Sequence, residues 1–136
     1  MIYLLDSSAC VDYLRRQNSI LRRWFFTGIR PSIRLCSVVR AELLLGVEKH
    51  GTERHRWEVM EFLGLFESYP FDDAAAAIYA KIRASLEREG RVIGSNDMLI
   101  AAIAVARGAT LVTGNAKEFS RIPALQCLTL ENLARL

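Results

Sequence analysis

The stretch YLLDSSACVDYL, residues 3–14, decides the fold class, because an apolar run stops at one acid, Asp6, and a helical pattern follows it. Residues 2–5 are apolar on both faces, which is typical of a strand buried in a parallel sheet. Asp6 has two interpretations: it caps the helix that follows, or it holds a cation beyond the end of the strand. The stretch by itself leaves both open.

The remainder of the chain repeats this order of strand and helix. Strands are predicted at 2–5, 34–37, 66–69, 110–113 and 127–129. Helices are predicted at 9–16, 20–27, 38–49, 53–65, 74–89 and 96–107, with a helical turn at 115–119. This alternation predicts one α/β domain over residues 1–136, a three-layer α/β/α sandwich with a short, mainly parallel central sheet.

The composition is that of a globular protein, with 136 residues of which 51% are hydrophobic. The longest apolar run, 98–106, is too short to span a membrane, and we expect no secretory signal. Cys10, Cys36 and Cys127 are odd in number and widely spaced, so we expect reduced thiols in a cytoplasmic protein. The net charge of +3 favours a polyanion partner only weakly.

Glu42 is an acid within a nearly apolar helix, where Val38, Val39 and Leu45 are its neighbours on the helical surface. A helix of this kind is expected to be buried. A buried carboxylate must be neutral, paired with a base or bound to a metal. A salt bridge to Arg40 or Arg15 is the structural alternative.

Asp97 repeats the pattern in the first turn of another apolar helix. The helix dipole favours an acid there, so capping could explain it. Ser95 and Asn96 are, however, better candidates for the cap, which leaves Asp97 to point elsewhere.

A further polar cluster follows the strand TLVT at 110–113, where Thr113, Asn115 and Glu118 lie close together in sequence. A simple connection between a strand and a helix would also explain it. If Asp6, Glu42 and Asp97 converge in the fold, their mutual repulsion demands a cation, and oxygen ligands select Mg²⁺, with Mn²⁺ as a substitute. We expect His50 and His55 to be solvated surface residues.

In this order and spacing, the residues resemble the PIN domain, and specifically the VapC-type toxin ribonucleases of bacterial toxin–antitoxin pairs. The resemblance is carried by LLDSSACVDYL at 4–14, SVVRAELLLG at 37–46, IGSNDMLIAAIAVARGATLVTGN at 93–115 and EFSRIPAL at 118–125. It implies a PIN-like sandwich in which Asp6, Glu42 and Asp97 bind Mg²⁺. It also places Ser7, Ser37 and Thr113 at small polar positions near that site.

Asn115 departs from the family pattern, because many members carry an aspartate at this position. The fourth acid of the site is then either missing or supplied by Glu118, so that Asn115 and Glu118 are both candidates for completing the catalytic group. The departure leaves one metal ion in place and makes a tightly held second ion doubtful.

The resemblance implies hydrolysis of an RNA phosphodiester bond, with Asp97 as the candidate for orienting the attacking water. Arg15 and Arg16, with Arg22 and Arg23, could track phosphates, although a solvated helix face explains each of them as well. The aromatic run 24–26 cannot face one core entirely, which leaves part of it for a partner. The family implies a VapB-type antitoxin that docks over such helices, and a homodimer.

Two other functions compete with a nuclease. A catalytically inactive PIN-like interaction module is compatible with Asn115 and with acids that only cap helices. A phosphate-accepting receiver domain also uses acids and Mg²⁺ at strand ends, but it requires a lysine after a late strand, and TLVTGN has none.

Overall fold

The computed structural model describes residues 1–26 and 32–133. The strands are β1 (Tyr3–Leu5), β2 (Ile33–Cys36), β3 (Ser68–Tyr69), β4 (Thr110–Thr113) and β5 (Cys127–Thr129). The helices are α1 (Ser7–Arg15), α2 (Ile20–Trp24), α3 (Ser37–His50), α4 (Glu53–Leu63), α5 (Asp73–Arg88), α6 (Ser95–Arg107), α7 (Ala116–Phe119) and α8 (Leu130–Leu133).

The five strands form one sheet in the order β3-β2-β1-β4-β5, and every neighbouring pair is parallel. β1 is the central strand, and Leu4 pairs with Arg34 of β2 on one side and with Leu111 of β4 on the other. Because all strands run in one direction, their carboxyl ends lie along one edge of the sheet. The predicted α/β fold with a short parallel sheet is confirmed.

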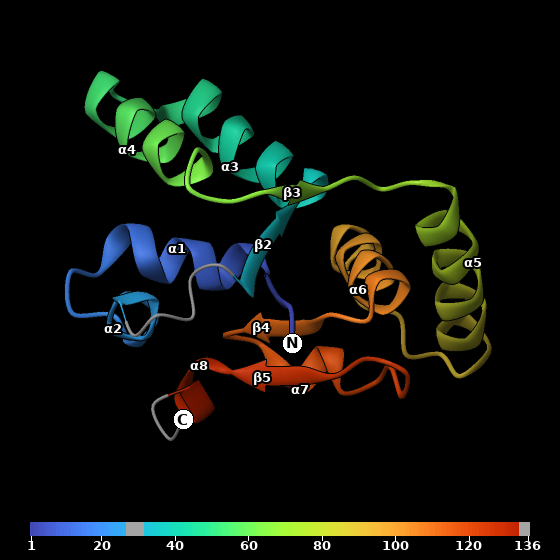
Figure 1. Ribbon diagram of the computed structural model, residues 1–136. Coiled ribbons are helices and arrows are strands. Elements are labelled where there is room, and N and C mark those ends of the chain that lie inside the picture. Colours follow the sequence, from blue (N-terminus) through green and yellow to red (C-terminus); the bar gives the residue numbers. More distant parts are fainter. Residues whose placement is uncertain (27–31, 134–136) are drawn as a thin grey trace.

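Helices cover both faces of the sheet, as Figure 1 shows. α1 and α2 lie on one side of β1 and β2, whereas α6, with α5 outside it, lies on the opposite side. The hairpin of α3 and α4 extends beyond the β3 edge of the sheet. This arrangement is the three-layer sandwich that the alternating pattern predicts.

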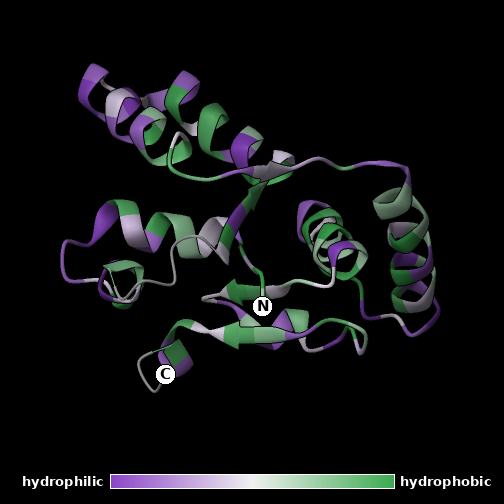
Figure 2. Cartoon of the chain, in the orientation of Figure 1, coloured by the Kyte–Doolittle hydropathy of each residue, from purple (hydrophilic) through white to green (hydrophobic). Residues whose placement is uncertain are grey.

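The core is formed by the apolar strands and by α6. All three residues of β1 are buried, and so are Met98 and residues 100–104 of α6. Figure 2 shows the corresponding hydrophobic colour along α6 and the central strands. α6 is apolar almost all round because it lies between the sheet and α5, which buries Ala75, Ile82 and Leu86 against it.

The prediction that the helix around Glu42 is buried all round is wrong. α3 buries only one face, through Val39, Leu43 and Val47, and Leu45 is 58% exposed. The reason is that α3 packs mainly against α4 in a hairpin that extends away from the sheet, so its other face stays in solvent. Glu42 is consequently half-buried rather than buried.

Smaller differences concern element ends. β3 has two residues where four were predicted, and α8 was not predicted. Residue 27 of the predicted second helix lies outside the described residues. Of the aromatic run, Trp24 and Phe25 are buried and Phe26 is 76% exposed, as expected for three consecutive bulky residues on a helix. In the described part of the chain, no helix has the length and apolar character needed to cross a membrane.

Leu4→Ala is expected to lower the free energy of unfolding by about 2–5 kcal/mol, because it leaves a cavity at the centre of β1, where Leu4 is fully buried. Leu45→Ala removes the same atoms from an exposed position and serves as the matched control. Urea unfolding followed by circular dichroism measures both. Equal losses for the two variants would show that the core is not centred on β1.

Candidate acidic site at the carboxyl edge of the sheet

Four acids reach the same edge of the sheet from different elements. Asp6 follows the last residue of β1, and Glu42 lies in the second turn of α3, directly after β2. Glu118 belongs to α7, which follows β4. Asp97 arrives from the other direction: α6 ends at Gly108, whose φ of 63° turns the chain back into β4. The first turn of α6 therefore lies near the end of β4.

Asp6 is 3% exposed and accepts hydrogen bonds at both carboxylate oxygens. Oδ1 accepts from the Ala9 amide (2.8 Å) and from the Ser8 hydroxyl (2.7 Å), and Oδ2 accepts from the Thr113 hydroxyl. Asp6 therefore caps α1 and also stands at the end of the central strand, so the two interpretations of this residue are not exclusive. Burial raises its pKa, the charge on Glu42 adds to the rise, and the three hydrogen bonds oppose it.

Glu42 accepts a hydrogen bond from Ser7, at 2.8 Å between Oγ and Oε1. Neither proposed arginine neutralises it within residues 1–26 and 32–133, where the ion pairs all involve other acids. Arg40 instead donates to the carbonyl oxygen of Leu63 at 3.3 Å. The salt-bridge alternative for Glu42 is therefore not realised in this part of the chain.

Asp97 lies in the first turn of α6 but does not cap it. The cap residue is Gly94, with no side-chain hydrogen bond, so Ser95 and Asn96 are not the caps that their positions indicated. Partial burial raises the pKa of Asp97 to about 6, and the charges of Asp6, Glu42 and Glu118 add to the rise. Asp97 therefore lies close enough to each of the other three acids to be repelled by it, and Asp6 is repelled by Glu42 as well.

Asn115 and Glu118 lie in different surroundings in the β4–α7 connection and α7. Asn115 is exposed, and its side chain makes no capping hydrogen bond. Its backbone amide donates to Thr113 Oγ1 at 2.9 Å. Glu118 is half-buried, and its charge acts on Asp97. Thr113 has no exposed surface, so it could influence a substrate only through Asp6, to which its hydroxyl donates.

Ser8 belongs to this group, and the sequence analysis missed it. Its hydroxyl donates to Asp6 and accepts from the Gly114 amide at 2.9 Å, so it joins the ends of β1 and β4. A hydroxyl residue two positions after a capping aspartate was the available signal in the sequence. That spacing is common at helix starts, and only the neighbouring strand gives it a second partner.

The remaining predicted residues lie in different places. The exposed Ser37 starts α3, and its hydroxyl accepts from the Phe71 amide at 3.2 Å. Arg15 borders a cleft of about 490 Å³ between α1, α3 and α4, together with Glu42. Arg16 points to a different cleft, beside Gly114, and forms an ion pair with Asp12 at 3.6 Å. The structure thus brings Arg15 to the side of Glu42 and does not bring Arg16 there.

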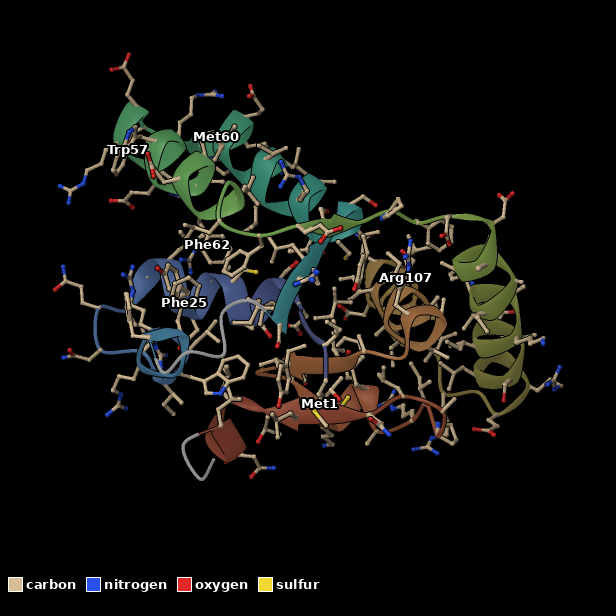
Figure 3. The ribbon with its side chains drawn as sticks, in the orientation of Figure 1. Met1, Phe25, Trp57, Met60, Phe62 and Arg107 are labelled. Atoms are coloured by element: carbon tan, nitrogen blue, oxygen red, sulfur yellow. The ribbon has the colours of Figure 1, made fainter. Side chains whose placement is uncertain are left out.

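The cleft beside Glu42 continues along α4 as a groove lined by both apolar and charged side chains. Leu14, Arg15 and Glu58 border both the cleft and the next hollow, which Tyr13, Trp57, Phe62 and Leu65 also line. Figure 3 shows Phe62 on the inner side of α4, toward Phe25, and Trp57 and Met60 farther out. Trp57 is 63% exposed. His50 and His55 are exposed as expected, and both border the cleft.

The donor set fits a hard divalent cation, because the acids offer only carboxylate oxygens and no described base is paired with them. As the side chains stand, however, no three described Asp, Glu, His or Cys residues are grouped to hold an ion directly. An ion at this edge would therefore take part of its ligands from water, as Mg²⁺ usually does in proteins.

The three cysteines are free, and Cys10 and Cys36 are buried beside the acids. Burial raises the pKa of the Cys36 and Cys127 thiols to about 11, and that of Cys10 also rises well above its usual value. These thiols are therefore neutral near pH 7 and unsuited to act as nucleophiles or soft metal ligands.

The raised pKa of Asp97 predicts a pH dependence of stability. The folded chain keeps this proton up to about pH 6, whereas the unfolded chain loses it near 3.8. The folded state then binds more protons between these values, so the contribution to stability is full below about pH 4 and is lost as the pH rises through 6. With EDTA present, Asp97→Asn should therefore stabilise the protein at pH 7.5 by about 1 kcal/mol, allowing for screening of this half-buried group.

Urea unfolding at pH 5 and pH 7.5 measures this difference. Asp73→Asn, at an exposed aspartate in the first turn of α5, is the matched control. If Asp97→Asn and Asp73→Asn change stability equally at both pH values, Asp97 is not repelled by the other acids.

Comparisons of the sequence and of the fold with known proteins point to the same family. Residues 3–125 match the PIN domain family. The chain is 38% identical to Ribonuclease VapC2 of Rickettsia felis over 92% of this chain and 95% of the relative. It is 34% identical to the tRNA(fMet)-specific endonuclease VapC of Salmonella typhimurium, over 91% and 94% of the two chains.

The solved structures agree with these relatives. VapBC2 from Rickettsia felis, bound to a DNA fragment from its promoter, superposes with a TM-score of 0.88 at 36% identity, covering 95% of this chain and 98% of the other. The fold of this chain is therefore the fold of those proteins. The chain belongs to the PIN-domain family, and within it to the group of VapC proteins.

Proposed function

We propose that this chain is a Mg²⁺-dependent endoribonuclease and the toxin of a VapBC-type toxin–antitoxin pair. The observation that carries the proposal is the group formed by Asp6, Glu42, Asp97 and Glu118, four acids whose charges are not neutralised by any base in the described part of the chain. A fold has no structural reason to gather unpaired acids at a strand edge, since their repulsion and desolvation both cost stability.

The names of the relatives support the RNA-cleaving class. The relatives in Rickettsia felis and Salmonella typhimurium are called a ribonuclease and a tRNA-specific endonuclease. A tRNA is accordingly the first substrate to test, with an unstructured RNA beside it. We propose hydrolysis that leaves a 5′-phosphate and a 3′-hydroxyl group, as expected for attack by water on phosphorus with departure of the 3′ oxygen.

Asp6, Glu42 and Asp97 are the residues that would hold the metal, partly through water. When bound, Mg²⁺ would supply Lewis-acid activation of water and neutralise negative charge on the reacting phosphate. Asn115 offers a carbonyl oxygen but no charge. Glu118, which lies near Asp97, is our candidate for the fourth acid.

Asp97 is the candidate for orienting the attacking water and taking its proton. Arg15 borders the same cleft as Glu42, where a guanidinium group can bind a phosphate on the RNA strand. Arg16 is paired with Asp12 and has a weaker claim.

A VapB-type antitoxin is the proposed protein partner. Several solved relatives are VapBC complexes, which supports a partner chain for this one as well. The groove along α4, with Trp57 at its rim and Glu42 at its inner end, combines aromatic side chains with acids such as Glu58, which would suit an amphipathic segment carrying a basic residue. We also propose a homodimer.

The direct test is cleavage of a tRNA and an unstructured RNA by the purified chain, with Mg²⁺ and with EDTA. EDTA should abolish cleavage, and Asp6→Asn should lower the rate by at least about a hundredfold, because the central acid at the end of β1 loses its charge. Circular dichroism must show that Asp6→Asn is folded. The cap should survive, since asparagine also caps helices well.

The matched control is Asp12→Asn, one and a half turns along α1, outside the group of acids. A chain that cleaves neither RNA with Mg²⁺ or Mn²⁺ would support the competing function, a PIN-like interaction module without activity. Cleavage that resists both EDTA and Asp6→Asn would contradict the acidic site.

The roles of Asn115 and Glu118 can be separated by a pair of variants. Glu118→Gln removes a charge that acts on Asp97 and should lower kcat about tenfold or more. Asn115→Ala should lower it less than threefold, because Asn115 is exposed and its backbone amide makes the contact with Thr113. The reverse order would make Asn115 the fourth member of the site. Single-turnover cleavage at saturating Mg²⁺ gives the comparison.

A further inference from the structure

Ser8 has more contacts than a residue in the first turn of a helix requires. Its hydroxyl donates to Asp6 Oδ1 at 2.7 Å and accepts from the Gly114 amide at 2.9 Å. Gly114 lies 106 residues after Ser8 in the sequence, directly after β4. The Ser8 side chain thus joins the ends of the two strands that carry Asp6 and Thr113.

Ser8 and Thr113 hold Asp6 in the same way from two sides. Each hydroxyl accepts one backbone amide of the β4–α7 connection, from Gly114 for Ser8 and from Asn115 for Thr113. A hydroxyl group has a single proton, and each of the two gives it to one oxygen of Asp6. Together with the Ala9 amide, three donors fix the plane of the carboxylate.

The two hydroxyl groups differ in exposure. Thr113 is completely buried, and its loss would affect the core between β1 and β4. Ser8 is exposed, so its side chain contributes little to the core, while its hydrogen bond to Asp6 faces the edge where the acids gather. A Cβ atom at Gly114 would make only ordinary van der Waals contacts, 3.4 Å from Ser8 Oγ and 3.5 Å from Leu130, so the hydrogen bond between the Gly114 amide and Ser8 does not depend on glycine.

We infer that Ser8 is a positioning residue, which holds the Asp6 carboxylate in the orientation that metal binding and RNA cleavage need. The inference rests on the proposed function and deepens it. Ser8 acts through Asp6. Its hydrogen bond to Oδ1 keeps the carboxylate from rotating, so that the lone pairs not used in hydrogen bonds keep a fixed orientation for a metal ion. A carboxylate that rotates would bind a divalent ion less tightly, because its orientation would have to be fixed on binding.

Ser8→Ala and Ser8→Thr in the full chain test this role. Ser8→Ala removes the hydroxyl, whereas Ser8→Thr keeps it and adds a methyl group at an exposed position. Binding of Mn²⁺, followed by the electron paramagnetic resonance signal of the free ion, gives a readout that does not depend on activity. We expect about tenfold weaker Mn²⁺ binding and about tenfold lower kcat in Ser8→Ala, with KM for RNA within twofold, as for a lost hydrogen bond to a charged group.

The conservative variant and a distant serine separate positioning from a merely structural role. Ser8→Thr should stay within about threefold of the unchanged protein in Mn²⁺ affinity and kcat. Ser85→Ala, in the last turn of α5, should change neither. Hydrogen exchange of the Gly114 amide, measured by NMR, should become faster in Ser8→Ala and remain slow in Ser8→Thr, because only the alanine lacks the acceptor.

Two results would overturn the role of Ser8 alone. In the first, Ser8→Ala keeps Mn²⁺ affinity and kcat within twofold of the unchanged protein, while Asp6→Asn loses both. In the second, Ser8→Ala and Ser8→Thr lose affinity and kcat equally. If Asp6→Asn binds Mn²⁺ as well as the unchanged protein does, or neither binds it, the proposed function fails and the role of Ser8 fails with it. The exchange of the Gly114 amide would then still report the hydrogen bond itself.

Discussion

Carboxylates that repel one another gather at one edge of the sheet, and the proposed function depends on this repulsion. Asp6, Glu42, Asp97 and Glu118 come from four different parts of the chain. Partial burial raises the pKa of Asp97 to about 6, and the charges of the other three acids add to the rise. Parallel strands impose this meeting, because every strand ends at the same edge. The apolar core makes it possible: β1 and α6 bury enough surface to offset several unfavourable charges.

Asp6 shows how one side chain can serve both fold and site. As the cap of α1 it accepts the Ala9 amide, and as the acid at the end of the central strand it accepts two hydroxyl groups. These donors favour its charged form, while burial opposes it. The capping bond also fixes the start of α1 relative to β1. Structural and functional interpretations of an acid at a strand end therefore need not compete.

Two different clefts lie on the two sides of α1. On one side, Arg15 borders the cleft with Glu42, and the groove along α4 leads away from it. On the other side, Arg16 and Asp12 border a second cleft of about 510 Å³ that includes Gly114 and Glu131. Of the four acids, Glu42 borders the first cleft, and none of them borders the second.

The sequence by itself determined the fold class and the candidate acids. Apolar runs that end in Asp6 and Thr113, and the apolar helix after Asp97, fix buried strands and a buried helix, since no other placement removes those side chains from water. Helix ends followed from local chemistry, as with the Asp72 cap of α5 and Gly108 after α6. These are short-range effects, which a sequence displays directly.

Only the tertiary structure decided how the acids are surrounded. The apolar character of α3 indicated burial on all sides, but the helix lies in a hairpin beyond the sheet and leaves Leu45 in solvent. Ser8 gained its second partner, Gly114, because β1 and β4 are neighbours although 106 residues separate the two positions. Contacts of this kind depend on strand order, and strand order follows from the packing of the whole chain rather than from any local pattern.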